Sequence, residues 1–206
     1  MSFALLFFTG YNGIYKSTQN VPFSRVMNSS NNPLSNHHKM FSFSDNRQRL
    51  TNIRIRSILK RCQQCYKLTN NAKNILYCSD ISDYKLHNFK KTVFFINTRQ
   101  HWLLIGVFPG RQCLVIDPLD MVKSWPDVTH SINSFCQINS LELFFFDFRF
   151  QRDTTQICGF LCLWITFKIS KMPFIRVWRL RNVLSSHRIS TLERGMMWAV
   201  HKHFRL

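Results

Sequence analysis

The sequence predicts an α+β domain in which a central, mainly antiparallel β-sheet packs against one buried helix. Short apolar runs rich in β-branched and aromatic residues occupy 92–97, 101–108 and 112–117, and turn-forming residues separate them. The Phe-rich run at 141–150 predicts a further strand. A polar loop then leads into residues 157–169, where the apolar run ICGFLCLWI predicts a helix that is buried on all sides.

Length and composition favour one folded domain with an extension. The chain has 206 residues, of which 45% are hydrophobic, and 20 phenylalanines supply material for a core. The net charge of +18 is uneven: residues 1–50 carry +4, 51–100 carry +8, 101–150 carry −2 and 151–206 carry +8. Such an excess favours contact with nucleic acid or another polyanion. A solvated basic surface that keeps the chain in solution explains the same charge equally well.

Neither a membrane anchor nor a disulfide framework is expected. No apolar run reaches the roughly 18 residues that a membrane span requires. The opening MSFALLFFTG lacks a basic leader and a small-residue cleavage site, so we expect it to form a first strand or helix. Seven irregularly spaced cysteines are typical of reduced thiols. These features predict a protein of the nucleus or cytoplasm (or of a virion, if viral) that is not secreted.

The first 90 residues divide by composition. Residues 1–23 are apolar and then turn-like, and we assign them to the same domain as the core at 91–206. Residues 24–90 predict a basic, polar insertion or linker, either genuine or an error of the gene model. A short basic helix is expected within 47–67.

Cysteine spacing raises a zinc site as an alternative. Cys62 and Cys65 form a Cys-x-x-Cys pair, and Cys78 and His87 are the further ligands that the sequence offers. Their spacing after the first pair does not match a zinc motif, so ordinary thiols are the favoured interpretation. We therefore expect neither a metal nor another cofactor.

Two further helices are expected in the core. Pro126 follows Ser124-Trp125 and predicts a helix start, with Asp127 placed to reach back to Ser124 as a cap. Apolar residues continue this helix at helical spacing, at Val128, Ile132 and Phe135. The basic and aromatic stretch 171–206 predicts a terminal helix over 191–203.

Four polar residues at the ends of these elements form a candidate catalytic group. His101 begins one strand and Asp117 ends the next, so a hairpin between the two strands makes them neighbours at one edge of the sheet. This arrangement suits a base and the carboxylate that orients it. Cys158 lies in the first turn of the buried helix, where the helix dipole favours a thiolate. Gln151 is a candidate amide donor to an oxyanion, together with the backbone N–H of Cys158.

Each of these residues also has an ordinary structural interpretation. A histidine at a strand start is commonly a surface residue, and Asp117 before Pro118 is a common turn opener. Gln151 fits a loop, and a lone cysteine on a helix usually acts as a small hydrophobic side chain. The order His, Asp, Gln, Cys at these spacings is what favours catalysis.

The motifs that carry these residues resemble the adenain and SUMO-protease (Ulp-like) superfamily of cysteine peptidases. FINTRQHWLLIGVF, LVIDPLD and FQRDTTQICGFLC are similar to its three motifs, and the likeness is greater to the adenovirus and large-DNA-transposon branch. The resemblance covers residues 92–168. It differs after Asp117, where Pro-Leu-Asp replaces the more common Ser-Leu-Gly.

The resemblance implies a papain-like fold and a thiol protease without cofactors. His101 is then the general base, Asp117 its orienting carboxylate, Gln151 the oxyanion donor and Cys158 the nucleophile. Trp102 would pack against this centre, and Gly159 would let a substrate backbone approach. The implied substrates are viral or transposon-encoded precursor proteins. A deconjugase for ubiquitin-like modifiers and a catalytically degenerate, DNA-binding relative remain as alternatives.

Overall fold

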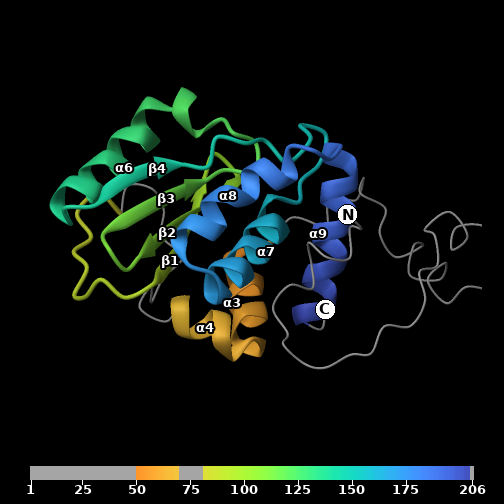
Figure 1. Ribbon diagram of the computed structural model, residues 1–206, viewed down its shortest axis with the longest axis horizontal. Helices are drawn as coiled ribbons and strands as arrows, with labels where there is room; N and C mark the ends of the chain where they lie inside the picture. Colours follow the sequence, from red (N-terminus) through yellow and green to blue (C-terminus); the bar gives the residue numbers. More distant parts are fainter. Residues whose placement is uncertain (1–49, 70–80, 205–206) are drawn as a thin grey trace, which may run out of the picture. The chain divides into compact units, whose positions relative to one another are not determined.

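The computed structural model describes residues 50–69 and 81–204, all of which belong to one compact unit, Asn46–Leu206 (Figure 1). The elements expected in residues 1–46, namely the opening strand or helix, the turns and the polar linker, lie outside the described residues, as does Cys78. The proposed division at residues 23 and 90 therefore stays a prediction.

The described residues form a mixed α+β fold with a four-stranded sheet in the order β1-β2-β3-β4. The strands are β1 (Thr92–Thr98), β2 (His101–Phe108), β3 (Gln112–Ile116) and β4 (Glu142–Phe145). The pairs β1–β2 and β2–β3 are antiparallel, and β3–β4 is parallel. The predicted α+β class and the β2–β3 hairpin are confirmed.

The fourth strand is shorter than its sequence predicts. The apolar run extends over 141–150, but β4 ends at Phe145 and the backbone N–H of Phe146 makes a last bond to the carbonyl of Val115. Phe146 and Phe150 remain buried and pack edge to face against each other. Within this run only Phe146 and Phe150 are fully buried, and both lie after the point at which β4 stops pairing with β3.

One face of the sheet is covered by α6 (Pro126–Ile138), which also provides the crossover that makes β3 and β4 parallel. Alternate strand residues, among them Phe94 and Ile105, form a buried cluster with Ile132 and Phe135 of this helix. The predicted start of α6 at Pro126 is confirmed, but the predicted cap is wrong. No side chain caps α6: its N-cap residue is Trp125, the Ser124 hydroxyl donates to the carbonyl of Met121, and the Asp127 carboxylate accepts from Arg99.

The other face is covered by α7 (Cys158–Lys171), the predicted buried helix (Figure 1). It packs on β2 and against α9 (Ile189–Phe204), with α8 (Phe174–Leu184) following it along the chain. Gly106 allows this contact to be close, because a side chain there would lie 3.1 Å from Ile169. Every residue of β2 is buried, as expected of a strand with helices on both faces.

The basic segment before the sheet contributes to the same core. It forms α3 (Asn52–Arg61), capped by Thr51, and α4 (Gln63–Thr69), which confirms the basic helix expected in this region. Both helices pack against α7, and the buried side chains of this segment include Ile55 of α3, Cys65 of α4 and Leu50 just before α3. Across residues 50–69 and 81–204, none of the helices is long and apolar enough to span a membrane.

Candidate active site

The β2–β3 hairpin brings His101 and Asp117 together, as its predicted register requires. Phe108 pairs with Gln112 and Leu104 with Ile116, so the start of β2 lies beside the end of β3. His101 Nε2 is 2.6 Å from Asp117 Oδ1, and both side chains are buried. This contact leaves Nδ1 of the ring free of Asp117.

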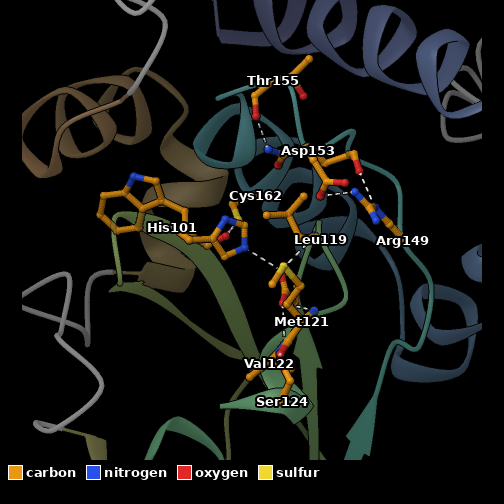
Figure 2. A network of polar contacts seen from close by, with 12 residues as sticks. His101, Leu119, Met121, Val122, Ser124, Arg149, Asp153, Thr155 and Cys162 are labelled. Carbon is orange, nitrogen blue, oxygen red and sulfur yellow. Dashed lines mark hydrogen bonds and ion pairs between the residues drawn. The ribbon is translucent and has the colours of Figure 1, made fainter.

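The carboxylate of Asp117 is held by the backbone of the turn that follows it, whose residues Leu119, Met121 and Val122 are labelled in Figure 2. Oδ1 accepts the backbone N–H of Leu119 at 2.9 Å, and Oδ2 accepts those of Met121 and Val122 at 2.7 and 2.8 Å. Burial alone would raise the pKa of Asp117, but the hydrogen bond from His101 and those from the turn lower it below its ordinary value. Asp117 is therefore a fixed anion beside the imidazole.

The environment of His101 favours its protonated form. Burial disfavours a charge on the ring, but hydrogen bonds and charge interactions with Asp117 and Cys158 outweigh it and raise the pKa of His101 to about 9. The Trp125 ring packs edge-on against the imidazole at 5.8 Å between centroids, and Arg99 lies over Trp125. Asp117 and Cys158 therefore both favour a charged imidazole at His101.

Cys158 is the first residue of α7, at the position predicted for it. The residue before the helix, Ile157, provides no capping side chain, so backbone N–H groups of the first turn are not occupied by a cap. The four candidate residues are all buried, with exposed fractions of 6% for His101, 4% for Asp117, 2% for Gln151 and 4% for Cys158.

Trp102 and Gly159 support this end of α7. The Trp102 indole donates to the carbonyl of Leu50 at 2.9 Å, and the space beside the Gly159 α-carbon is filled by Leu50 and Trp102. Trp102 therefore lies beside Gly159, the residue after Cys158, and its role at a catalytic centre stays a prediction. Gly159 is needed for this packing, and the approach of a substrate backbone at the glycine stays a prediction.

Gln151 lies in the loop before α7 with its side chain fully enclosed. Its Nε2 donates to the carbonyl oxygen of Thr155 at 2.6 Å, which determines how the amide is oriented because a carbonyl oxygen cannot accept from another oxygen. Its Oε1 is buried and has no hydrogen-bond partner in the part of the chain that the structure describes. A buried acceptor without a partner costs about 1–3 kcal/mol, so it needs an explanation, and a catalytic role is one of those available.

The Gln151 loop is also bound by a residue that the sequence analysis missed. Glu193 of α9 accepts the Arg152 backbone N–H at 2.7 Å, Arg152 Nε at 2.8 Å and the Thr155 hydroxyl at 2.7 Å. The sequence does contain a signal that could have identified Glu193, because it is the only acidic residue after Asp153 in a strongly basic stretch.

The remaining cysteines do not form a metal centre among the described residues. Within 50–69 and 81–204, no three His, Cys, Asp or Glu side chains gather where they could hold a metal ion. Cys62 and Cys65 lie in contact as free thiols, and the hydrogen bond from Cys65 lowers the pKa of Cys62 to about 6 despite partial burial. The zinc alternative depends on Cys78, which is outside these residues.

Comparison with known proteins adds no assignment. No protein-family model matches the sequence, and a search of curated proteins finds no match either.

Proposed function

We propose that the chain is a cysteine peptidase of the adenain and Ulp-like type, with Cys158 as nucleophile and His101–Asp117 as its base and orienting pair. The observation that carries the proposal is the imidazole of His101, which is hydrogen-bonded to the buried carboxylate of Asp117 and whose pKa is raised in part by Cys158, the first residue of α7. A nucleophile, a base and a group that orients the base are the parts that thiol catalysis requires.

The reaction proceeds by acyl transfer through Cys158. The thiolate attacks the carbonyl carbon of the scissile peptide bond, and the new oxyanion accepts hydrogen bonds from Gln151 and from the backbone N–H of Cys158. The C–N bond then breaks as protonated His101 gives its proton to the leaving amine, which leaves a thioester on Cys158. His101, now neutral, removes a proton from water, which hydrolyses the thioester and restores the thiol.

Several observations support these roles. The raised pKa of His101 provides the proton that the amine needs, and the lowered pKa of Asp117 keeps the ion pair intact at neutral pH. Nε2 of Gln151 carries two hydrogens, and only one is used by the carbonyl of Thr155. The second hydrogen can therefore serve an oxyanion.

A peptide-library digest tests the proposal. The full chain and its Cys158→Ala variant are incubated with a diverse peptide mixture, and new termini are read by mass spectrometry. We expect cleavage by the full chain and none by the variant, whose melting temperature should stay close to that of the parent. Equal products from both proteins would reject Cys158 as the nucleophile.

The substrate class follows from the resemblance and is tested separately. Precursor proteins of a virus or transposon are the proposed substrates, and ubiquitin-like conjugates are the alternative. Cleavage of a ubiquitin-like fusion without cleavage of any library peptide would select the deconjugase function.

Nucleic-acid contact is a second candidate property, and α8 is the observation that favours it. The helix exposes Arg176 and Arg179 and places Arg181 over the Trp178 ring at 3.9 Å, and its eleven residues include no acid. Cationic side chains beside an aromatic ring suit a phosphate backbone and its bases. Salt-dependent DNA retention that falls in Arg176→Ala/Arg179→Ala would support this property, and unchanged retention would reject α8 as its location.

A further inference from the structure

The loop between Gln151 and Cys158 is held by a single buried carboxylate from a distant helix. Glu193 is 0% exposed, and its two oxygens accept three hydrogen bonds from Arg152 and Thr155. Burying a carboxylate is costly unless it is paired and hydrogen-bonded, so this network anchors the loop at Arg152 and Thr155. The loop bond between Thr155 N and Arg152 O, at 3.2 Å, closes the turn between the two residues that Glu193 binds.

The same turn positions the side chain of Gln151. Its amide nitrogen donates to the carbonyl of Thr155, the residue whose hydroxyl Glu193 accepts. A continuous set of contacts therefore runs from Glu193 through Thr155 to the Gln151 amide. Displacing Thr155 moves the acceptor that orients this amide.

We propose that Glu193 is the positioning residue for the Gln151 amide, acting through Thr155 and Arg152, and that it thereby controls stabilisation of the oxyanion. The inference rests on the proposed function. Glu193 touches neither the substrate nor the thiol, so its effect is confined to steps that form an oxyanion. Thiol activation depends on the separate His101–Asp117 pair.

Two reactions at Cys158 separate these effects. Acylation by 4-nitrophenyl acetate passes through an oxyanion and needs no peptide specificity, whereas alkylation by iodoacetamide displaces iodide and forms no oxyanion. Both rates are measured at Cys158 by mass spectrometry on the full chain. The ratio of acylation to alkylation then reports the oxyanion donor alone.

Matched variants test each contact. Glu193→Gln keeps the shape and removes the charge, and Glu142→Gln at the exposed first residue of β4 is its control. Thr155→Val removes the hydroxyl, and Thr155→Ser restores it. Gln151→Ala removes the donor itself.

We expect Glu193→Gln and Thr155→Val to lower the acylation rate by about 10-fold or more, since misplacement of a catalytic group by about 1 Å can cost on the order of 100-fold. Alkylation should be unchanged, and Thr155→Ser and Glu142→Gln should behave as the parent. Adding Glu193→Gln to Gln151→Ala should cause little further loss, because both act through one amide.

Three results would overturn the inference. Acylation that is unchanged in Glu193→Gln but lowered in Gln151→Ala would separate Glu193 from the donor. Parallel loss of both rates with a lower melting temperature would make Glu193 a residue of general stability. A parent protein that is not acylated at Cys158 at all would instead reject the proposed function, and the inference with it.

Discussion

The backbone N–H of Gln151 donates to the carbonyl oxygen of Pro118 at 3.0 Å, and the N–H of Phe150 donates to the same oxygen. Pro118 directly follows Asp117, whose carboxylate is bound by the next residues of the turn. The turn that fixes the acid partner of His101 therefore also fixes the backbone of the candidate oxyanion donor. A change in this turn is expected to affect both.

Asp120 is the residue of that turn where a substitution should stabilise the fold. Its φ of 55° lies in the left-handed region, which glycine adopts without strain. Burial and the nearby charges of Asp147 and Asp117 also raise the pKa of Asp120, so its carboxylate is poorly accommodated. We expect Asp120→Gly to raise the free energy of unfolding by about 0.5–1 kcal/mol and Asp120→Val to lower it by about 1–2 kcal/mol, measured by urea denaturation. Equal stability of the two variants would contradict this explanation.

The His101–Asp117 contact should make stability depend on pH. The pKa of His101 is raised from 6.5 to about 9 in the folded chain, so the stabilisation is complete below about pH 6.5 and is lost as the pH rises through about 9. In the parent, this contact should make the free energy of unfolding fall by a few kcal/mol between about pH 6 and pH 10. Asp117→Asn should remove that contribution to the fall.

A matched control for this titration is Asp127→Asn, which breaks the exposed Arg99–Asp127 pair at 2.9 Å. Exposed pairs contribute little, so the pH dependence should remain that of the parent. If the free energy of unfolding of Asp117→Asn still falls over this pH range as in the parent, other groups cause the fall.

Thiol reactivity should show the coupling between His101 and Cys158. Cys62 is half-buried and its pKa is about 6, so it will also react at neutral pH, and the experiment is best done in a Cys62→Ser background. We expect Cys158 to be alkylated well ahead of the other remaining cysteines and its rate to fall on His101→Ala, as followed by mass spectrometry. A rate that the mutation does not alter would show an unassembled site.

Gly159 provides a test of the packing beside Cys158, where α7 contacts Leu50 and Trp102. A side chain at this position would lie 3.1 Å from Leu50 Cβ and 3.2 Å from Trp102 Cδ1, closer than ordinary contact. Gly159→Ala should therefore destabilise the fold by about 1–3 kcal/mol, as overpacking does. Adding Leu50→Ala should recover part of the loss, because the two substitutions share one contact. Additive losses in thermal denaturation would disprove this contact.

The sequence predicted the elements that local patterns determine. Turn residues between apolar runs located the β2–β3 hairpin, and the hairpin in turn placed His101 beside Asp117. The position of Cys158 followed from the change from a polar loop to an apolar helix. These features depend on neighbours in the chain, which periodicity and turn chemistry report directly.

Contacts between distant segments could not be predicted in the same way. Asp127 had a suitable local partner in Ser124, but Arg99 from the β1–β2 turn binds it instead. Glu193 reaches back to Thr155 from another helix, and no spacing rule connects these two residues. The apolar run at 141–150 predicted a strand over its whole length, but its composition does not show that strand pairing stops at Phe145.

The contact between Leu50 and Trp102 has a consequence for how the chain can be shortened. A protein trimmed to begin at β1 would retain all four candidate catalytic residues, yet it would remove the carbonyl that receives the Trp102 indole and the aliphatic side chain that rests on Gly159. The indole N–H would be left unbonded, and the first turn of α7 would lose its support. Recombinant versions that preserve the nucleophile should therefore start before residue 50.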